Sequence, residues 1–152
     1  MAANRTGALM VMACAATIVG CSGSSDSTDT SAPMSAKING VAWAAIGQPA
    51  FTYSANALSV AAFDLTYTIT FSITGITAPG TYSIGTQPVV LFIVSKAPSS
   101  GWNTFGAGAT GTLTVTTFTA THVAGTFSFS AVPQNGTTGA MVVTQGAFDI
   151  TK

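Results

Sequence analysis

The sequence predicts an all-β domain over residues 35–152, either an antiparallel β-sandwich or a partly closed β-barrel of about eight to ten short strands. Three observations support this prediction. Apolar and polar residues alternate with a period of two, turn residues separate the alternating segments, and no long segment places apolar residues at helical spacing. Alternation of this kind indicates strands with one face in a core and one face in solvent. It does not distinguish a sandwich from a barrel.

Segments with this alternation occur along the whole of the predicted domain and mark its strands. The clearest segment is LTYTITFSIT, residues 65–74, in which large apolar side chains alternate with Thr and Ser. The segments GTLTVTT, GTFSFSAV and GAFDIT repeat the pattern towards the carboxyl end. The side chains predicted to face the core are Tyr67, Ile69, Phe71, Ile73, Leu113, Val115, Phe127, Phe129, Phe148 and Ile150. Residues 89–94, VVLFIV, are continuously apolar, which predicts a strand that is covered on both faces or lies near the middle of a sandwich.

Turn residues fall between these strands. Pro79-Gly80 favours a type II turn, and Asn39-Gly40 and Asn135-Gly136 favour tight turns. Residues 97–101, APSSG, are expected to form a loop, and residues 44–50 a short turn or loop.

The amino terminus predicts export. A polar start containing Arg5 precedes an apolar segment, residues 8–19, which is too short to span a bilayer but suits the core of a signal peptide. The sequence Ile18-Val19-Gly20-Cys21 that follows resembles the lipobox of bacterial lipoproteins. This resemblance implies a signal peptide over residues 1–20, cleavage between Gly20 and Cys21, and lipid on the Cys21 sulfur and amino group. The alternatives are an ordinary secretory signal, or lipidation of Cys14, which would leave a very short apolar core.

Residues 21–34 are expected to be a disordered tether that begins at the lipidated Cys21. The segment SGSSDSTDTSAP has no large apolar side chain and cannot bury enough surface to become ordered. A flexible coil of this length spans roughly 20 Å. The protein is therefore expected in the cell envelope, facing the periplasm or the medium. Ser22 in place of Asp favours the outer membrane over the inner membrane.

The domain itself resembles a known family. The matching segments are INGVAW (38–43), PGTYSIG (79–85), GTLTVTTF (111–118), VAGTFSFSA (123–131) and VVTQGAFDI (142–150). They are similar to a small all-β domain of unknown function that is common in lipoproteins of Bacteroidetes-like bacteria. The resemblance implies a fold and no catalytic residues. Gln145-Gly146 stands where the family pattern leads us to expect an Asn-Gly turn.

The inventory of ionisable side chains argues against an enzyme. After the tether the chain carries Asp64, Asp149, Lys37, Lys96, Lys152 and His122. Nothing in the sequence brings the two carboxylates together as a glycosidase requires. No nucleophile elbow accompanies His122, which is expected to be an exposed turn residue. We predict no catalytic residues, no metal site and no cofactor, and the lack of a basic patch predicts no nucleic-acid partner.

Three aromatic residues are candidates for ligand binding. Trp102 lies in an expected Gly-rich loop, SSGWNTFGAG, whereas Trp43 is expected to cap the core, and Tyr53 is a possible neighbour. The sequence therefore predicts a membrane-anchored, non-catalytic module with a structural or interaction role. Its expected partners are the lipid bilayer, through acylated Cys21, and a glycan or an envelope protein. The alternative function is a surface module that binds a glycan or small ligand on exposed aromatic side chains.

Overall fold

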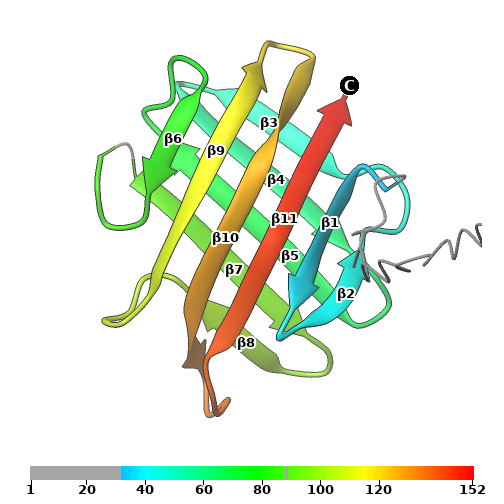
Figure 1. Cartoon of the computed structure of the whole chain (residues 1–152), viewed down its shortest axis with the longest axis vertical. Coiled ribbons are helices and arrows are strands. Elements are labelled where there is room, and N and C mark those ends of the chain that lie inside the picture. The colour runs from blue at the N-terminus through cyan, green and yellow to red at the C-terminus, as the bar shows by residue number, and fades with distance from the viewer. Residues whose placement is uncertain (1–31, 88) are drawn as a thin grey trace, which may run out of the picture.

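The computed structural model describes residues 32–87 and 89–152, which form a single antiparallel sheet of eleven strands (Figure 1). The strands are β1 (Met34–Ile38), β2 (Val41–Ala44), β3 (Ala50–Ser54), β4 (Ala57–Phe63), β5 (Tyr67–Thr74), β6 (Gly80–Ser83), β7 (Val89–Lys96), β8 (Ser100–Asn103), β9 (Thr110–Phe118), β10 (His122–Gln134) and β11 (Met141–Thr151). The predicted all-β class is confirmed. Within the described ranges, no helix has the length and apolar character needed to cross a bilayer.

The sheet curls into two layers that face each other. One layer has the order β2-β1-β11-β10-β9-β6 and the other has the order β8-β7-β5-β4-β3, and the strands of the two layers cross (Figure 1). The long strand β10 joins the layers: its first part pairs with β9, and its last residues, Val132–Gln134, pair with β8. The architecture is therefore a half-barrel closed along one side by β10.

The core lies between the two layers and contains the side chains that the alternation predicts. Ile69, Phe71, Ile73 and Leu113 are fully buried. Val115, Phe127, Phe129, Phe148 and Ile150 are also in the core, and Tyr67 packs against it half-buried. Phenylalanine rings from both layers meet at its centre, where Phe92 stacks on Phe129 with ring centroids 4.2 Å apart. These buried faces hold the layers together, because removing apolar surface from water is the dominant favourable term in folding.

Of the two expectations for residues 89–94, coverage on both faces is wrong. Val90, Phe92 and Val94 point into the core, but Val89 and Ile93 remain 44% and 38% exposed on the outer face of β7. Branched apolar side chains also suit exposed strand positions. The continuous apolar run in residues 89–94 therefore does not mean that another layer of the protein covers the outer face of β7.

Two of the predicted turns form as expected. Asn39 and Gly40 have φ values of 49° and 84° and connect β1 to β2. Asn135 and Gly136 have φ values of 52° and 78° and lie within a turn closed by a 3.0 Å hydrogen bond from Thr137 N to Gln134 O. Both pairs have the left-handed conformation that Asn and Gly tolerate best.

Other connections differ from the expectations. The prediction of a type II turn at Pro79-Gly80 is wrong. Gly80 is the first residue of β6, and its φ is not positive, as a type II turn would require. The 97–101 loop is shorter than expected, since β8 begins at Ser100. The 44–50 connection is a loop whose end residues, Ala44 and Ala50, belong to β2 and β3.

Gln145-Gly146 is a bulge within β11 and not a turn. Phe127 pairs with Gly146 whereas Phe129 pairs with Val143, so β11 has one residue more than β10 at this point. Gln145 takes up the extra length with a φ of 51°. An Asn would also suit this left-handed position, so the expected Asn-Gly pair does not require a turn here.

The folded domain starts one residue earlier than expected. Met34, assigned above to the end of the tether, is the first residue of β1 and is fully buried. The carbonyl of Pro33 accepts a 2.9 Å hydrogen bond from Asp149 N. Pairing of β1 with β11 therefore makes Met34 part of the folded domain.

Candidate functional site

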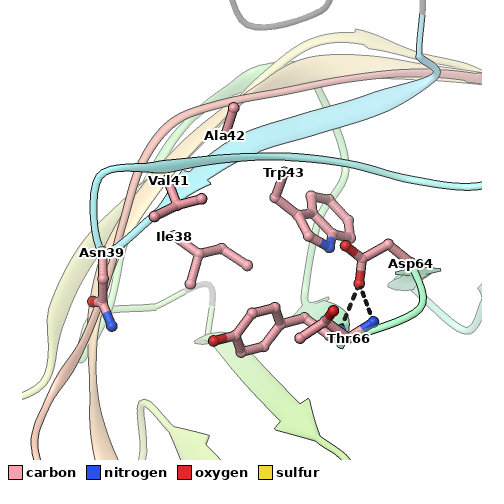
Figure 2. A pocket seen from close by; sticks show the side chains of 8 residues that line it. Ile38, Asn39, Val41, Ala42, Trp43, Asp64 and Thr66 are labelled. Carbon is pink, nitrogen blue, oxygen red and sulfur yellow. Dashed lines mark hydrogen bonds between the residues drawn. The ribbon is translucent and has the colours of Figure 1, made fainter.

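The candidate site is a pocket between the β1–β2 hairpin and the turn that joins β4 to β5 (Figure 2). Its volume is about 330 Å³, at the lower end of the range for small-molecule sites. The side chains that line it are Ile38, Asn39, Val41, Ala42, Trp43, Asp64, Thr66 and Tyr67. Most of its wall is apolar, with a few polar groups.

The hairpin positions Trp43 at this pocket. The Asn39-Gly40 turn sets the register in which Ala36 pairs with Trp43, on the side of β2 that faces the core. Trp43 is only 5% exposed, so the expectation that it caps the core is confirmed. Its indole Nε1 is buried and finds no hydrogen-bond partner among the residues that the structure describes. Figure 2 shows this nitrogen and the Asp64 carboxylate directed into the same space.

Asp64 organises the turn on the other side of the pocket. Its Oδ1 accepts hydrogen bonds from the backbone N–H groups of Thr66, at 2.7 Å, and Tyr67, at 2.5 Å. Asp64 N donates to Tyr67 O at 2.9 Å, which closes the turn. This is the usual behaviour of Asp at the start of a turn, where the carboxylate takes the place of a backbone carbonyl. The carboxylate is therefore held in place by the backbone that it supports.

Trp102 does not provide an exposed binding surface. It lies in β8 and not in a loop, and it is 8% exposed. Its Nε1 donates to the carbonyl of Gly139 at 2.9 Å, which satisfies the buried N–H. Because the faces of both indoles are buried, the proposed binding of a glycan on exposed tryptophans is wrong.

Tyr53 is not brought to either tryptophan. It is half-buried on β3, where its hydroxyl donates to Asn56 Oδ1 at 3.2 Å and its ring meets Phe118 edge-on. Strands β2, β3 and β8 lie on different sides of the molecule (Figure 1). The three candidate aromatics therefore do not share one groove.

The expectation for His122 also needs correction. It is the first residue of β10 and not a turn residue, and its Nε2 lies 2.8 Å from Asp149 Oδ1 on β11. The His122 side chain is 37% exposed and that of Asp149 is 74% exposed. Asp64 lines the separate pocket. In residues 32–87 and 89–152 no three His, Cys, Asp or Glu side chains gather in a way that could hold a metal ion.

Of the residues that line this pocket, only Trp43 is a candidate for ligand binding from the sequence. Asp64 followed by Thr66 is a recognisable signal for a side-chain-capped turn. Nothing local shows that this turn lies against the β1–β2 hairpin, because the two segments are not neighbours in sequence or in the sheet order. Gly20 and Cys21, the predicted cleavage and lipidation residues, lie outside the described residues.

Residues 30–150 match a family described as a domain of unknown function, DUF6252. The chain belongs to this family. The DUF6252 match covers all of the strands except the last residue of β11, Thr151, and confirms the resemblance to an all-β domain of unknown function. Comparisons with curated proteins and with solved structures give no match. The DUF6252 description assigns no activity.

Proposed function

We propose that this DUF6252 protein is a lipoprotein of the cell envelope whose β domain has a non-catalytic structural or interaction role. The observation that carries the proposal is the sequence Ile18-Val19-Gly20-Cys21 directly after an apolar segment of signal-peptide length. The folded domain begins at Met34, so a short segment without large apolar residues separates it from Cys21. This arrangement suits a domain attached to a membrane surface by its amino terminus.

The proposed anchor is strong for a physical reason. Each buried methylene contributes about 0.8 kcal/mol to membrane binding, and one acyl chain alone gives only reversible attachment. Two or three chains on Cys21 would hold the protein at the bilayer on any biological timescale. Ser22 after Cys21 supports the outer membrane as the destination.

A non-catalytic role is supported by what the described carboxylates do. Asp64 Oδ1 is engaged by two backbone N–H groups, and Asp149 pairs with His122 on the outer part of the sheet. Neither carboxylate is placed opposite the other at one site, which is the arrangement that two-carboxylate hydrolysis requires. The contacts of Asp64 and Asp149 are therefore explained by structural roles, in a turn and in a hydrogen-bonded pair on the sheet.

The anchor is tested by replacing the cysteines one at a time in cells fed with radiolabelled palmitate. Cys21→Ser is expected to abolish incorporation of the label and to release the protein from the membrane fraction. Cys14→Ser is the matched control, because it also removes one thiol from the amino-terminal region, and it should retain both properties. Label that persists in Cys21→Ser, or that is lost in Cys14→Ser instead, contradicts the assignment of Cys21.

A further inference from the structure

The two buried indoles of the domain differ in their hydrogen bonding. Trp102 Nε1 donates to Gly139 O, whereas Trp43 Nε1 has no partner in the described part of the chain. Most buried polar groups in native proteins are paired, because an unmade hydrogen bond leaves the cost of removing the group from water uncompensated. An unpaired N–H that faces a pocket therefore calls for an acceptor from outside the fold.

Asp64 does not supply that acceptor, since no hydrogen bond joins either of its carboxylate oxygens to Trp43 Nε1. Its carboxylate is directed into the same pocket (Figure 2), and its Oδ1 accepts hydrogen bonds from the backbone N–H groups of Thr66 and Tyr67. The pocket thus presents a donor, Trp43 N–H, and a fixed acceptor, Asp64, that are not bonded to each other.

The charges and walls of the pocket restrict its ligand. Asp64 carries the one formal charge among the eight lining side chains, and Lys96 Nζ lies outside the lining, 5.4 Å from the Tyr67 ring centre. An anion could accept from Trp43 but would be repelled by Asp64. A cation could pair with Asp64 but would leave the indole N–H without an acceptor. A hydroxyl group meets both requirements, since it accepts from Nε1 and donates to the carboxylate.

We propose that this pocket binds a small neutral ring compound that carries hydroxyl groups, of the size of a monosaccharide. One hydroxyl lies between Trp43 Nε1 and the Asp64 carboxylate, and the C–H face of the ring packs on the apolar wall formed by Ile38 and Val41 (Figure 2). Because Nε1 is buried, side chains of the pocket wall shift when the ligand enters. The site goes beyond the proposed envelope role and does not depend on the anchor.

The test uses the full chain, ¹⁵N-labelled and purified in a polyoxyethylene detergent, which has no sugar headgroup. The sequence contains two tryptophans, so the spectrum has two indole N–H resonances, which a Trp102→Phe sample assigns. Addition of D-glucose is expected to shift the Trp43 resonance and to leave that of Trp102 unchanged, with a dissociation constant of about 1 mM. A Trp43 resonance that stays fixed at saturating glucose, or equal shifts of both resonances, overturns the proposal.

Calorimetric titration tests how the charge of the ligand, the Asp64 carboxylate and the Trp43 N–H group affect binding. D-glucuronate should bind several-fold more weakly than D-glucose, and Asp64→Asn should remove this difference, because an Asn side chain keeps the Oδ1 acceptor of the turn without the charge. Asp149→Asn is the matched control and should behave like the wild type. Trp43→Phe should weaken glucose binding by roughly tenfold. Tighter binding of D-glucosamine than of D-glucose would instead indicate a cation site and overturn the neutral assignment.

If glucose does not bind but Cys21 is labelled with palmitate, the ligand site fails and the anchor stands. If glucose binds but Cys21 carries no lipid, the ligand site stands and the anchor fails. The two proposals therefore fail separately.

Discussion

Gly125 provides a direct test of how β9 and β10 fit together. A Cβ atom added at this position would lie 2.0 Å from the backbone oxygen of Thr114 and 2.8 Å from Cζ of Phe148. The first neighbour is backbone, so no change of rotamer relieves the clash. Since ordinary contact begins at 3.4 Å, Thr114 O and the new methyl would have to separate by about 1.4 Å (3.4 minus 2.0).

Gly125→Ala should therefore destabilise the domain severely. Separating the strands by this much, against a normal spacing of about 4.8 Å, breaks one or two backbone hydrogen bonds at about 1 kcal/mol each. Overpacking adds about 1–3 kcal/mol, which gives a total loss of about 3 kcal/mol. For a domain of this size the melting temperature should fall by roughly 10 °C.

The assay is thermal and urea unfolding followed by circular dichroism, with Gly101→Ala as the matched control. Gly101 also lies in a strand, but its added Cβ would meet no atom closer than 4.0 Å, the backbone oxygen of Val94. The control should be neutral or slightly stabilising, because alanine restricts the unfolded chain. A Gly125→Ala protein that melts within about 2 °C of the wild type would refute the close approach of Gly125 to Thr114.

The backbone conformation of Ala55 and the hydrogen bonding of the two tryptophans should both affect stability. Ala55 joins β3 to β4 with a φ of 49°, a conformation that costs an alanine about 1 kcal/mol, so Ala55→Asn should raise the free energy of unfolding by up to that amount in urea titration. A loss of stability in Ala55→Asn would contradict the left-handed turn. Trp102→Phe should lose about 1–2 kcal/mol more stability than Trp43→Phe, because it breaks a hydrogen bond to Gly139 O, whereas Trp43 Nε1 bonds to nothing described. Equal losses in the same urea assay would show that Trp43 N–H is satisfied in the free protein.

Much of the fold follows from local sequence pattern. The alternation of residues 67–73 identifies the core face of β5, and the same pattern identifies the buried pairs in β9, β10 and β11. Asn39-Gly40 and Asn135-Gly136 mark their turns because few other residues adopt positive φ. The turn at Ala55-Asn56 carries a weaker signal than the Asn-Gly pairs, because only one of its two residues, Asn56, favours positive φ.

The candidate site could be predicted only in part. Trp43 was recognised as a core residue, and its unpaired N–H is a property of its surroundings and not of its sequence neighbours. Asp64 was seen as an isolated carboxylate, although it shapes a turn that faces Trp43. The pocket exists only when these two segments meet.

The sequence by itself determined the all-β class, the inward face of most strands and the two Asn-Gly turns, because each depends on residues close together in the chain. Only the tertiary structure decided that β10 serves both layers, that Trp102 is buried, and that the outer face of β7 stays exposed. These features depend on which distant segments pack together. Period-two alternation fixes which side of a strand is apolar, but it does not say what covers either side.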